Sequence, residues 1–258
     1  MAGDENKDVT YAGYLRLGTL LDQQRPLSGG DSADELMFIV AHQTCELWFK
    51  VVLRELTAVR DSVAGGVIEP ALLALRRVAA VQHVLLDEIA VLESMQPGGF
   101  LAFRDLLGSA SGYESVQYRE IEFLAGAKDA ATIDPTAGRQ PGGREALEHR
   151  YAEPSVWDAA VSLLVARGLA ADSSDAGVRA AVTAVFADPV RDFPVWQLLR
   201  GLLEFDAGEA IWRSRHTQMA ELMIGRKPGT GGSSGVGYLA SRVDLRYFPV
   251  LWDAASLL

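Results

Sequence analysis

The residues best suited to chemistry lie toward the carboxyl end of the chain. Residues 212–216 read Trp-Arg-Ser-Arg-His, and a loop of glycine, serine and threonine follows at residues 229–235. The imidazole of His216 can ligate iron, and the guanidinium groups of Arg213 and Arg215 can pair with carboxylates. Glycines allow the following loop to close over a bound molecule. The combination suits a large, flat, anionic cofactor such as haem.

His42 and His216 also have a simpler interpretation. His42 follows Phe38 by four residues, so the two side chains share one face of an otherwise apolar helix. Either histidine could be a hydrogen-bonded core residue. Arg213, three residues before His216, favours a functional site, because a buried guanidinium requires an anion. A carboxylate on a helix or a propionate of a cofactor could supply that anion.

The histidine and cysteine spacing does not indicate a zinc site. No His-x-x-x-His, His-Glu-x-x-His or cysteine pair occurs, and His83 and His149 lie among charged neighbours that favour the surface. Cys45 is the only cysteine, so no intrachain disulfide can form. A reducing cytoplasm is therefore the simplest location.

A second arginine could recognise a substrate. Phe100 and Arg104 are four residues apart, so an aromatic ring and a guanidinium share a helical face. Such a pair can clamp a carboxylate, although a surface arginine whose stem covers the core is the alternative. The glycine-rich segment lacks the Lys of a phosphate-binding Walker motif, and no strand precedes it as in a dinucleotide-binding motif. It could instead be a lid that closes over a ligand or a flexible linker.

Composition and charge limit the possible partners. The chain has 258 residues, 49% of them hydrophobic, and a formal net charge of −10. Nucleic acid and anionic membranes are not expected partners, because binding them needs clustered Lys and Arg. The start of the chain is polar, and no uninterrupted apolar run approaches the roughly 18 residues of a membrane span. We expect a soluble, cytoplasmic protein.

Apolar residues recur at helical spacing along most of the chain, without strand-like alternation or internal repeats. This pattern predicts one all-α domain of packed helices over residues 1–258. Ser32 and Glu35 are expected to form a capping box at the first long helix, and Pro70 to open the second. Residues 126–143 are expected to be a surface connection, and the aromatic segment 247–252 to pack on the body. Helices are expected over residues 32–64, 70–96, 100–107, 115–126, 153–170 and 176–187, and from 190 or 195 to 224.

Taken together, these segments resemble the tryptophan 2,3-dioxygenase family. The blocks that carry the resemblance occur in order and cover most of the chain: residues 11–17, 38–48, 103–112, 117–123, 212–216 and 229–235. The resemblance implies an all-helical bundle that binds haem b between helices and assembles as a homotetramer.

The same resemblance implies roles around the cofactor. It makes His216 the axial ligand of the iron, with Trp212 and Arg213 beside the haem. His42 would lie on the distal side and accept a hydrogen bond from the indole N–H. Ser111 would lie near the bound oxygen.

Substrate-binding roles follow in the same way. Phe38 and Phe100 would flank the substrate ring, and Arg104 would pair with its carboxylate. Thr230, on a mobile loop over residues 226–237, would reach the amino-acid head group. An N-terminal arm, residues 1–30, would complete the site of a neighbouring subunit through Tyr11, Tyr14 and Leu15.

The implied reaction uses O2 to oxidise the indole C2=C3 bond of L-tryptophan, giving N-formylkynurenine. Leu222, Pro228 and residues 206–208 depart from the usual family pattern, which leaves two alternatives open. One is a monooxygenase of the same fold that forms a 2-oxindole, or a hydroxylated product, from tryptophan or a substituted, for example methylated, tryptophan. The other is a non-catalytic haem-binding helical protein.

Overall fold

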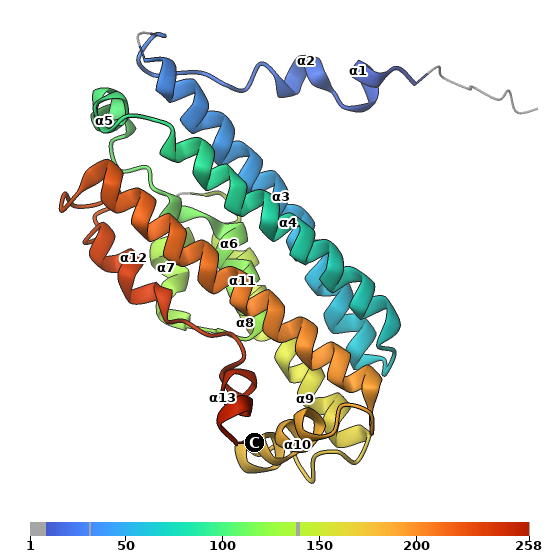
Figure 1. Cartoon of the computed structure of the whole chain (residues 1–258). Helices are drawn as coiled ribbons and strands as arrows, with labels where there is room; N and C mark the ends of the chain where they lie inside the picture. Colours follow the sequence, from blue (N-terminus) through green and yellow to red (C-terminus); the bar gives the residue numbers. More distant parts are fainter. Residues whose placement is uncertain (1–8, 31, 138–139, 258) are drawn as a thin grey trace, which may run out of the picture.

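Three long helices form the frame of the protein. In the computed structural model, which describes residues 9–30, 32–137 and 140–257, these are α3 (Ala33–Ala64), α4 (Glu69–Glu93) and α11 (Phe193–Ile224). Figure 1 shows them side by side, with α4 next to both α3 and α11. The described part of the chain contains no strand, and the predicted all-α class is confirmed.

The frame is held by apolar stripes at helical spacing. Leu56 and Val59 of α3, Val78 of α4 and Leu199 and Leu202 of α11 are fully buried in one core. Burying a side chain of this size contributes roughly 1.5–3 kcal/mol relative to leaving it exposed. The core therefore fixes how the three helices face one another, and with them the residues they carry.

The shorter helices, apart from α1 and α2 on the N-terminal arm, pack around this frame. They are α1 (Tyr11–Tyr14), α2 (Leu17–Leu20), α5 (Pro97–Arg104), α6 (Val116–Ala125), α7 (Ile133–Ala137), α8 (Gly143–Ala152), α9 (Val156–Ala166), α10 (Asp175–Ala187), α12 (Val236–Val243) and α13 (Pro249–Leu257). Short 3-10 turns occupy Asp105–Leu107, Gly112–Glu114 and Ala130–Thr132.

The start of α3 differs from the prediction. Ser32 is at the N-cap, but its side chain makes no capping hydrogen bond. The carboxylate of Glu35 instead accepts hydrogen bonds from the backbone N–H groups of Leu27 (2.7 Å) and Ser28 (2.9 Å). The predicted capping box is therefore wrong, because the preceding segment turns back and takes the carboxylate. Pro70 does lie in the first turn of α4, as predicted.

The segment between residues 126 and 143 is more structured than predicted. It contains α7, and Thr132, Ile133, Thr136 and Ala137 are buried. The expectation of a plain surface connection is wrong here. The helix predicted from residue 153 is α9, which begins at Val156 after a capping box formed by Ser155 and Asp158. Helix α8 is a separate helix that precedes α9. Helix α12 was not predicted.

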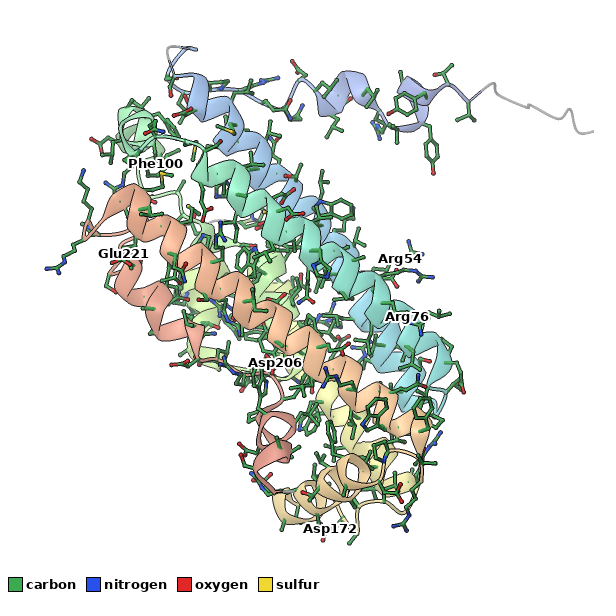
Figure 2. The ribbon with its side chains drawn as sticks, in the orientation of Figure 1. Arg54, Arg76, Phe100, Asp172, Asp206 and Glu221 are labelled. Atoms are coloured by element: carbon green, nitrogen blue, oxygen red, sulfur yellow. The ribbon has the colours of Figure 1, made fainter. Side chains whose placement is uncertain are left out.

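The C-terminal segment packs on the body, as predicted. Tyr247 and Phe248 are buried, and their backbone N–H groups donate to Asp206 of α11 at 2.8 and 2.9 Å. The indole N–H of Trp252 donates to the same carboxylate oxygen at 2.9 Å. Figure 2 shows Asp206 where α11 passes this segment.

The part of the N-terminal arm that carries α1 and α2 extends away from the helical body (Figure 1). Tyr11 and Tyr14 are 76% and 77% exposed. Helix α3, which follows, is the one helix of the described residues that is long and apolar enough to cross a membrane by length and composition alone. In this protein it packs against α4, α6 and α9.

Candidate functional site

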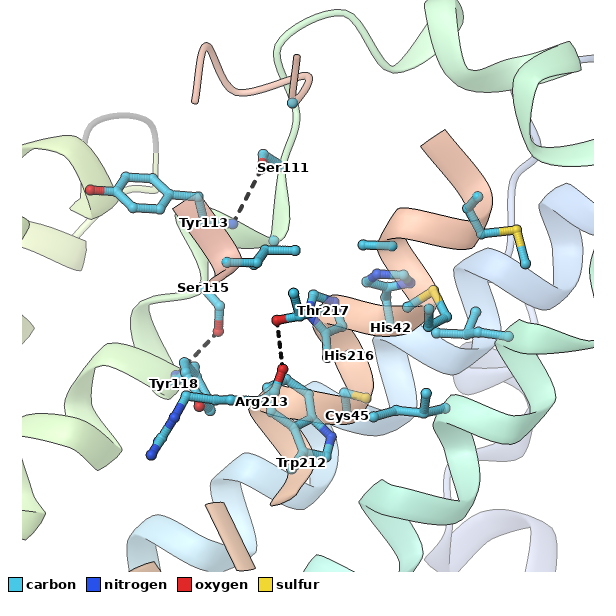
Figure 3. Close-up of a pocket in the computed structure, with 18 of the residues that line it drawn as sticks. His42, Cys45, Ser111, Tyr113, Ser115, Tyr118, Trp212, Arg213, His216 and Thr217 are labelled. Atoms are coloured by element: carbon cyan, nitrogen blue, oxygen red, sulfur yellow. Dashed lines mark hydrogen bonds between the residues drawn. The ribbon is translucent and has the colours of Figure 1, made fainter. Parts of the chain in front are cut away.

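A cavity of about 330 Å³ opens between α3, α4, α5, the turn before α6, α6, α11, the loop before α12 and α12 itself. Every predicted site residue outside the N-terminal arm lines it: Phe38, His42, Phe100, Arg104, Ser111, Trp212, Arg213, His216 and Thr230. Tyr11, Tyr14 and Leu15 do not, because the arm leaves the body of its own chain. Figure 3 shows His42 and His216 in the pocket on two different helices.

His216 is a neutral imidazole. Its enclosure by protein lowers its pKa to about 4, and the proximity of His42 acts in the same direction. The ring stacks on Trp212, with centroids 5.2 Å apart and planes 8° from parallel. Neither ring nitrogen has a hydrogen-bond partner within the part of the chain that the structure describes. A neutral imidazole with an available lone pair is a good iron ligand.

His42 is held in one tautomer. Its Nδ1–H donates to the carbonyl of Phe38, one turn earlier on α3, at 2.8 Å. Burial lowers the pKa of His42, although the Phe38 carbonyl and the carboxylates of Glu46 and Glu88 oppose this shift. The ring is therefore neutral and its Nε2 carries a free lone pair, so it can accept a hydrogen bond from a bound molecule.

Phe38 and Phe100 form an apolar wall of the cavity next to His42, and the fully buried Phe103 packs behind them. The ring of Phe38 lies 5.6 Å from that of Phe100 and 5.4 Å from that of Phe103, and Phe100 and Phe103 are 5.3 Å apart. Phe38 is also 4.1 Å from the His42 ring. Such a wall suits a flat aromatic ligand whose ring carries one polar N–H.

The glycine-rich loop covers the other end of the cavity. Arg104 donates to the carbonyl of Pro228, and the hydroxyl of Thr230 donates to the carbonyl of Ala110 at 2.5 Å. Gly231 lies so close to Ser111 that an added Cβ would be 2.7 Å from the serine Cβ. The loop therefore packs directly on the turn that carries Ser111, with Arg104 at its edge.

Arg213 finds its partners within the protein. Its guanidinium donates to the Tyr247 hydroxyl at 3.1 Å and to the Leu245 carbonyl at 2.7 Å. The carboxylate of Glu209, one turn earlier on α11, lies 3.9 Å away. The sequence left two possible anions for Arg213, a helix carboxylate or a cofactor propionate. The structure contains the first of these, Glu209 of α11.

A second charged cluster was missed by the sequence reasoning. Arg119 and Arg242 share the carboxylate of Glu122, and Tyr238 accepts a hydrogen bond from Arg119 at 3.4 Å. All four residues line the cavity, and two cations to one carboxylate leave a positive charge there. The three-residue spacing of Arg119 and Glu122 on α6 was the available signal.

Several buried donors at the cavity lack an acceptor. Within the described residues, the indole N–H of Trp212 and the Nε–H groups of Arg119 and Arg213 are buried without a hydrogen-bond partner. An unpaired buried donor costs roughly 1–3 kcal/mol. Together with the positive charge of the Arg119 cluster, they indicate a site for a ligand that carries anionic or acceptor groups.

Comparison with known proteins places the chain in a family. The sequence profile described as tryptophan 2,3-dioxygenase matches residues 2–140 and 143–258. A tryptophan 2,3-dioxygenase of Nocardioides sp. is 46% identical over 258 residues, which cover 98% of this chain and 96% of the relative. A tryptophan 2,3-dioxygenase of Caulobacter vibrioides is 40% identical, covering 98% and 99%, and one of Pseudomonas fluorescens is 39% identical, covering 97% and 92%. With the cavity, its two neutral imidazoles and its aromatic wall, these matches show that the chain belongs to the tryptophan 2,3-dioxygenase family.

Proposed function

We propose that this protein is a haem-dependent oxygenase that uses O2 to oxidise the indole C2=C3 bond of L-tryptophan, giving N-formylkynurenine. The observation that carries the proposal is the pair of neutral imidazoles on α3 and α11 in one cavity, with Arg104 at its edge. The relatives named above supply the substrate, since each is described as a tryptophan 2,3-dioxygenase.

The residues of the cavity fit a haem. His216 would ligate the iron through a ring nitrogen that has no partner among the described residues. The unpaired donors of Trp212, Arg119 and Arg213 match the need of two propionates for hydrogen bonds in a buried place. When bound, haem supplies the iron at which dioxygen is activated.

The side chains of the other cavity walls would hold the substrate. Nε2 of His42 accepts the indole N–H, because Nδ1–H is already committed to the Phe38 carbonyl. Phe38 and Phe100 enclose the ring and exclude water. Arg104 pairs with the carboxylate through guanidinium N–H groups that its hydrogen bond to the Pro228 carbonyl leaves available. Thr230 then reaches the amino-acid head group from the loop.

The assembly belongs to the same proposal. We infer a homotetramer in which the arm of one subunit completes the cavity of its neighbour. Tyr11 and Tyr14 are almost fully exposed on an arm that leaves its own body. Exposed aromatic side chains on a protruding segment favour burial against another chain.

Reconstitution with hemin tests the proposal. Purified protein loaded with hemin should show a Soret band typical of histidine ligation, which His216→Ala should lose. Turnover of L-tryptophan with O2 and a reductant should add two oxygen atoms to the product. A gain of one oxygen would indicate the monooxygenase alternative instead. Protein that stays colourless after reconstitution would overturn the proposal.

A further inference from the structure

Glu209 is a buried carboxylate that lies beside the cavity without lining it. It is 5% exposed and lies on α11, seven residues before His216, so the two share a helical face. Burial raises its pKa, while Arg213 and the hydrogen bonds from Gln82 and Tyr118 oppose the shift. Charged residues are almost never fully buried without partners, so the groups around the Glu209 carboxylate are expected to stabilise it.

Donors from three other parts of the fold converge on this carboxylate. Gln82 of α4 donates to Oε1 at 3.0 Å. Tyr118 of α6 and Tyr247 of the C-terminal segment donate to Oε2 at 3.2 and 3.4 Å. Arg213, one turn later on α11, adds a charge at 3.9 Å. Glu209 therefore ties α4, α6 and the C-terminal segment to the helix that carries His216.

The backbone of α11 is adapted to this arrangement. At Gly208 an added Cβ would lie 2.6 Å from Oε1 of Gln82. The glycine leaves room for the Gln82 side chain, which donates to the carbonyl of Phe205 at 2.9 Å as well as to Glu209. Glycine inside a helix costs roughly 0.5–1 kcal/mol relative to alanine, and here the close approach of Gln82 depends on it.

An aromatic stack connects Tyr118 to His216. The Tyr118 ring lies 5.3 Å from the Trp212 ring, tilted by 39°, and Trp212 stacks nearly parallel on His216. Phe49 closes the stack from the side, 5.3 Å from Tyr118 and 6.5 Å from Trp212. A metal-ligating histidine usually donates its second N–H to a carboxylate or carbonyl, which fixes the ring. Among the described residues His216 has no such partner, so the stack sets its plane.

We propose that Glu209 is a positioning residue for the axial histidine. By accepting the Tyr118 hydroxyl it fixes the Tyr118 ring, and through Trp212 it fixes the plane of the His216 imidazole. The inference rests on the proposed function, because it assigns His216 to the iron. It identifies a residue that acts on the cofactor from outside the cavity.

Two variants isolate this role in the hemin-loaded, full-length protein. Glu209→Gln keeps the size but weakens acceptance of the tyrosine hydroxyls. Tyr118→Phe keeps the stacked ring and removes the hydroxyl that donates to Glu209 and also interacts with Arg213. Both should shift the iron–histidine stretching band of the ferrous protein in the same direction and weaken hemin binding roughly tenfold to a hundredfold. Glu204→Gln, at an exposed ion pair with Arg200 on the same helix, is the matched control and should change neither.

The outcomes separate this inference from the proposed function. If His216→Ala abolishes the stretching band while both test variants leave it at the wild-type position, the positioning role is overturned and the haem assignment stands. If His216→Ala keeps the band, the haem assignment itself fails. Should Glu209→Gln not fold, Tyr118→Phe decides alone: a shifted band supports the role, and an unshifted one overturns it.

Discussion

At the scale of single residues, the two cavity histidines differ in what holds them. His42 has its tautomer fixed by the Phe38 carbonyl, whereas His216 is held by stacking on Trp212. Both have lowered pKa values because protein encloses them. His42 can thus accept a hydrogen bond, and His216 can offer a lone pair to a metal.

The His42 tautomer predicts a pH dependence. Nε2 accepts the indole N–H only while the ring is neutral, and the pKa of His42 lies below its ordinary 6.5. We therefore expect kcat/KM to hold at pH 6.5 and to fall at more acidic pH, as the ring protonates through its lowered pKa. The pH profile of turnover, measured for the wild type and His42→Ser, checks this. The acidic fall assigned to His42 should disappear in the variant.

A surface histidine provides the control for that profile. His83 on α4 is exposed, so His83→Gln should keep the wild-type curve. An acidic fall that persists in His42→Ser with the same midpoint would assign the titration to another group.

Sequence spacing predicts some of these residues and not others. Phe38 with His42, and Phe100 with Arg104, each lie four residues apart on one helix, and helical geometry alone brings such pairs together. Glu209 and Gln82 are separated by more than a hundred residues, and nothing local in either segment indicates their contact. Residues of the second kind become visible only when the packing of α4 against α11 is known.

At the scale of elements, the long helices follow from periodicity, whereas their ends and connections do not. The 3.6-residue pattern predicts α3, α4 and α11 because each buries a continuous stripe. The capping-box motif is misleading at Glu35, whose carboxylate accepts from an earlier segment, and composition is misleading at α7, whose Asp and Pro residues are typical of a loop. In both places, tertiary contacts outweigh the local signal.

The anchoring of the C-terminal segment to α11 gives the second prediction. One oxygen of Asp206 accepts two buried backbone N–H donors and the indole N–H of the more exposed Trp252, so Asp206→Ala would leave the two buried donors without an acceptor. At roughly 1–3 kcal/mol for each unpaired buried donor, we expect the free energy of unfolding to fall by about 2 kcal/mol or more. Urea unfolding of the cofactor-free protein measures this loss.

A surface carboxylate in the same region is the comparison. Asp253 of α13 pairs with Arg179 of α10 where both are largely exposed. Because such pairs contribute about 0–1 kcal/mol, Asp253→Asn should be nearly neutral. If the two variants lose similar stability, the Asp206 carboxylate does not anchor the segment.

At the scale of the whole molecule, one chain forms the cavity, and the helices α1 and α2 of its N-terminal arm lie away from it. The cavity is walled by several helices and by the glycine-rich loop, and Tyr11 and Tyr14 lie outside it on a protruding segment. Residue spacing in the sequence does not predict the position of this arm, because periodicity shows only which face of a helix is buried. The shared site that we propose is suggested in the sequence only by the resemblance to the family.

A shared site predicts complementation between two defective variants. Arg104→Ala leaves the arm intact but removes the carboxylate partner inside the cavity. Tyr11→Ser with Tyr14→Ser leaves the cavity intact and alters only exposed side chains, so folding should be unaffected. Each variant alone should turn over little tryptophan. In equal co-expression, random assembly gives about a quarter of all sites an intact cavity together with an intact neighbouring arm. We therefore expect about a quarter of wild-type turnover, with light scattering confirming mixed tetramers. Mixed oligomers without recovered activity, or full activity of the tyrosine variant alone, would show that each subunit completes its own site.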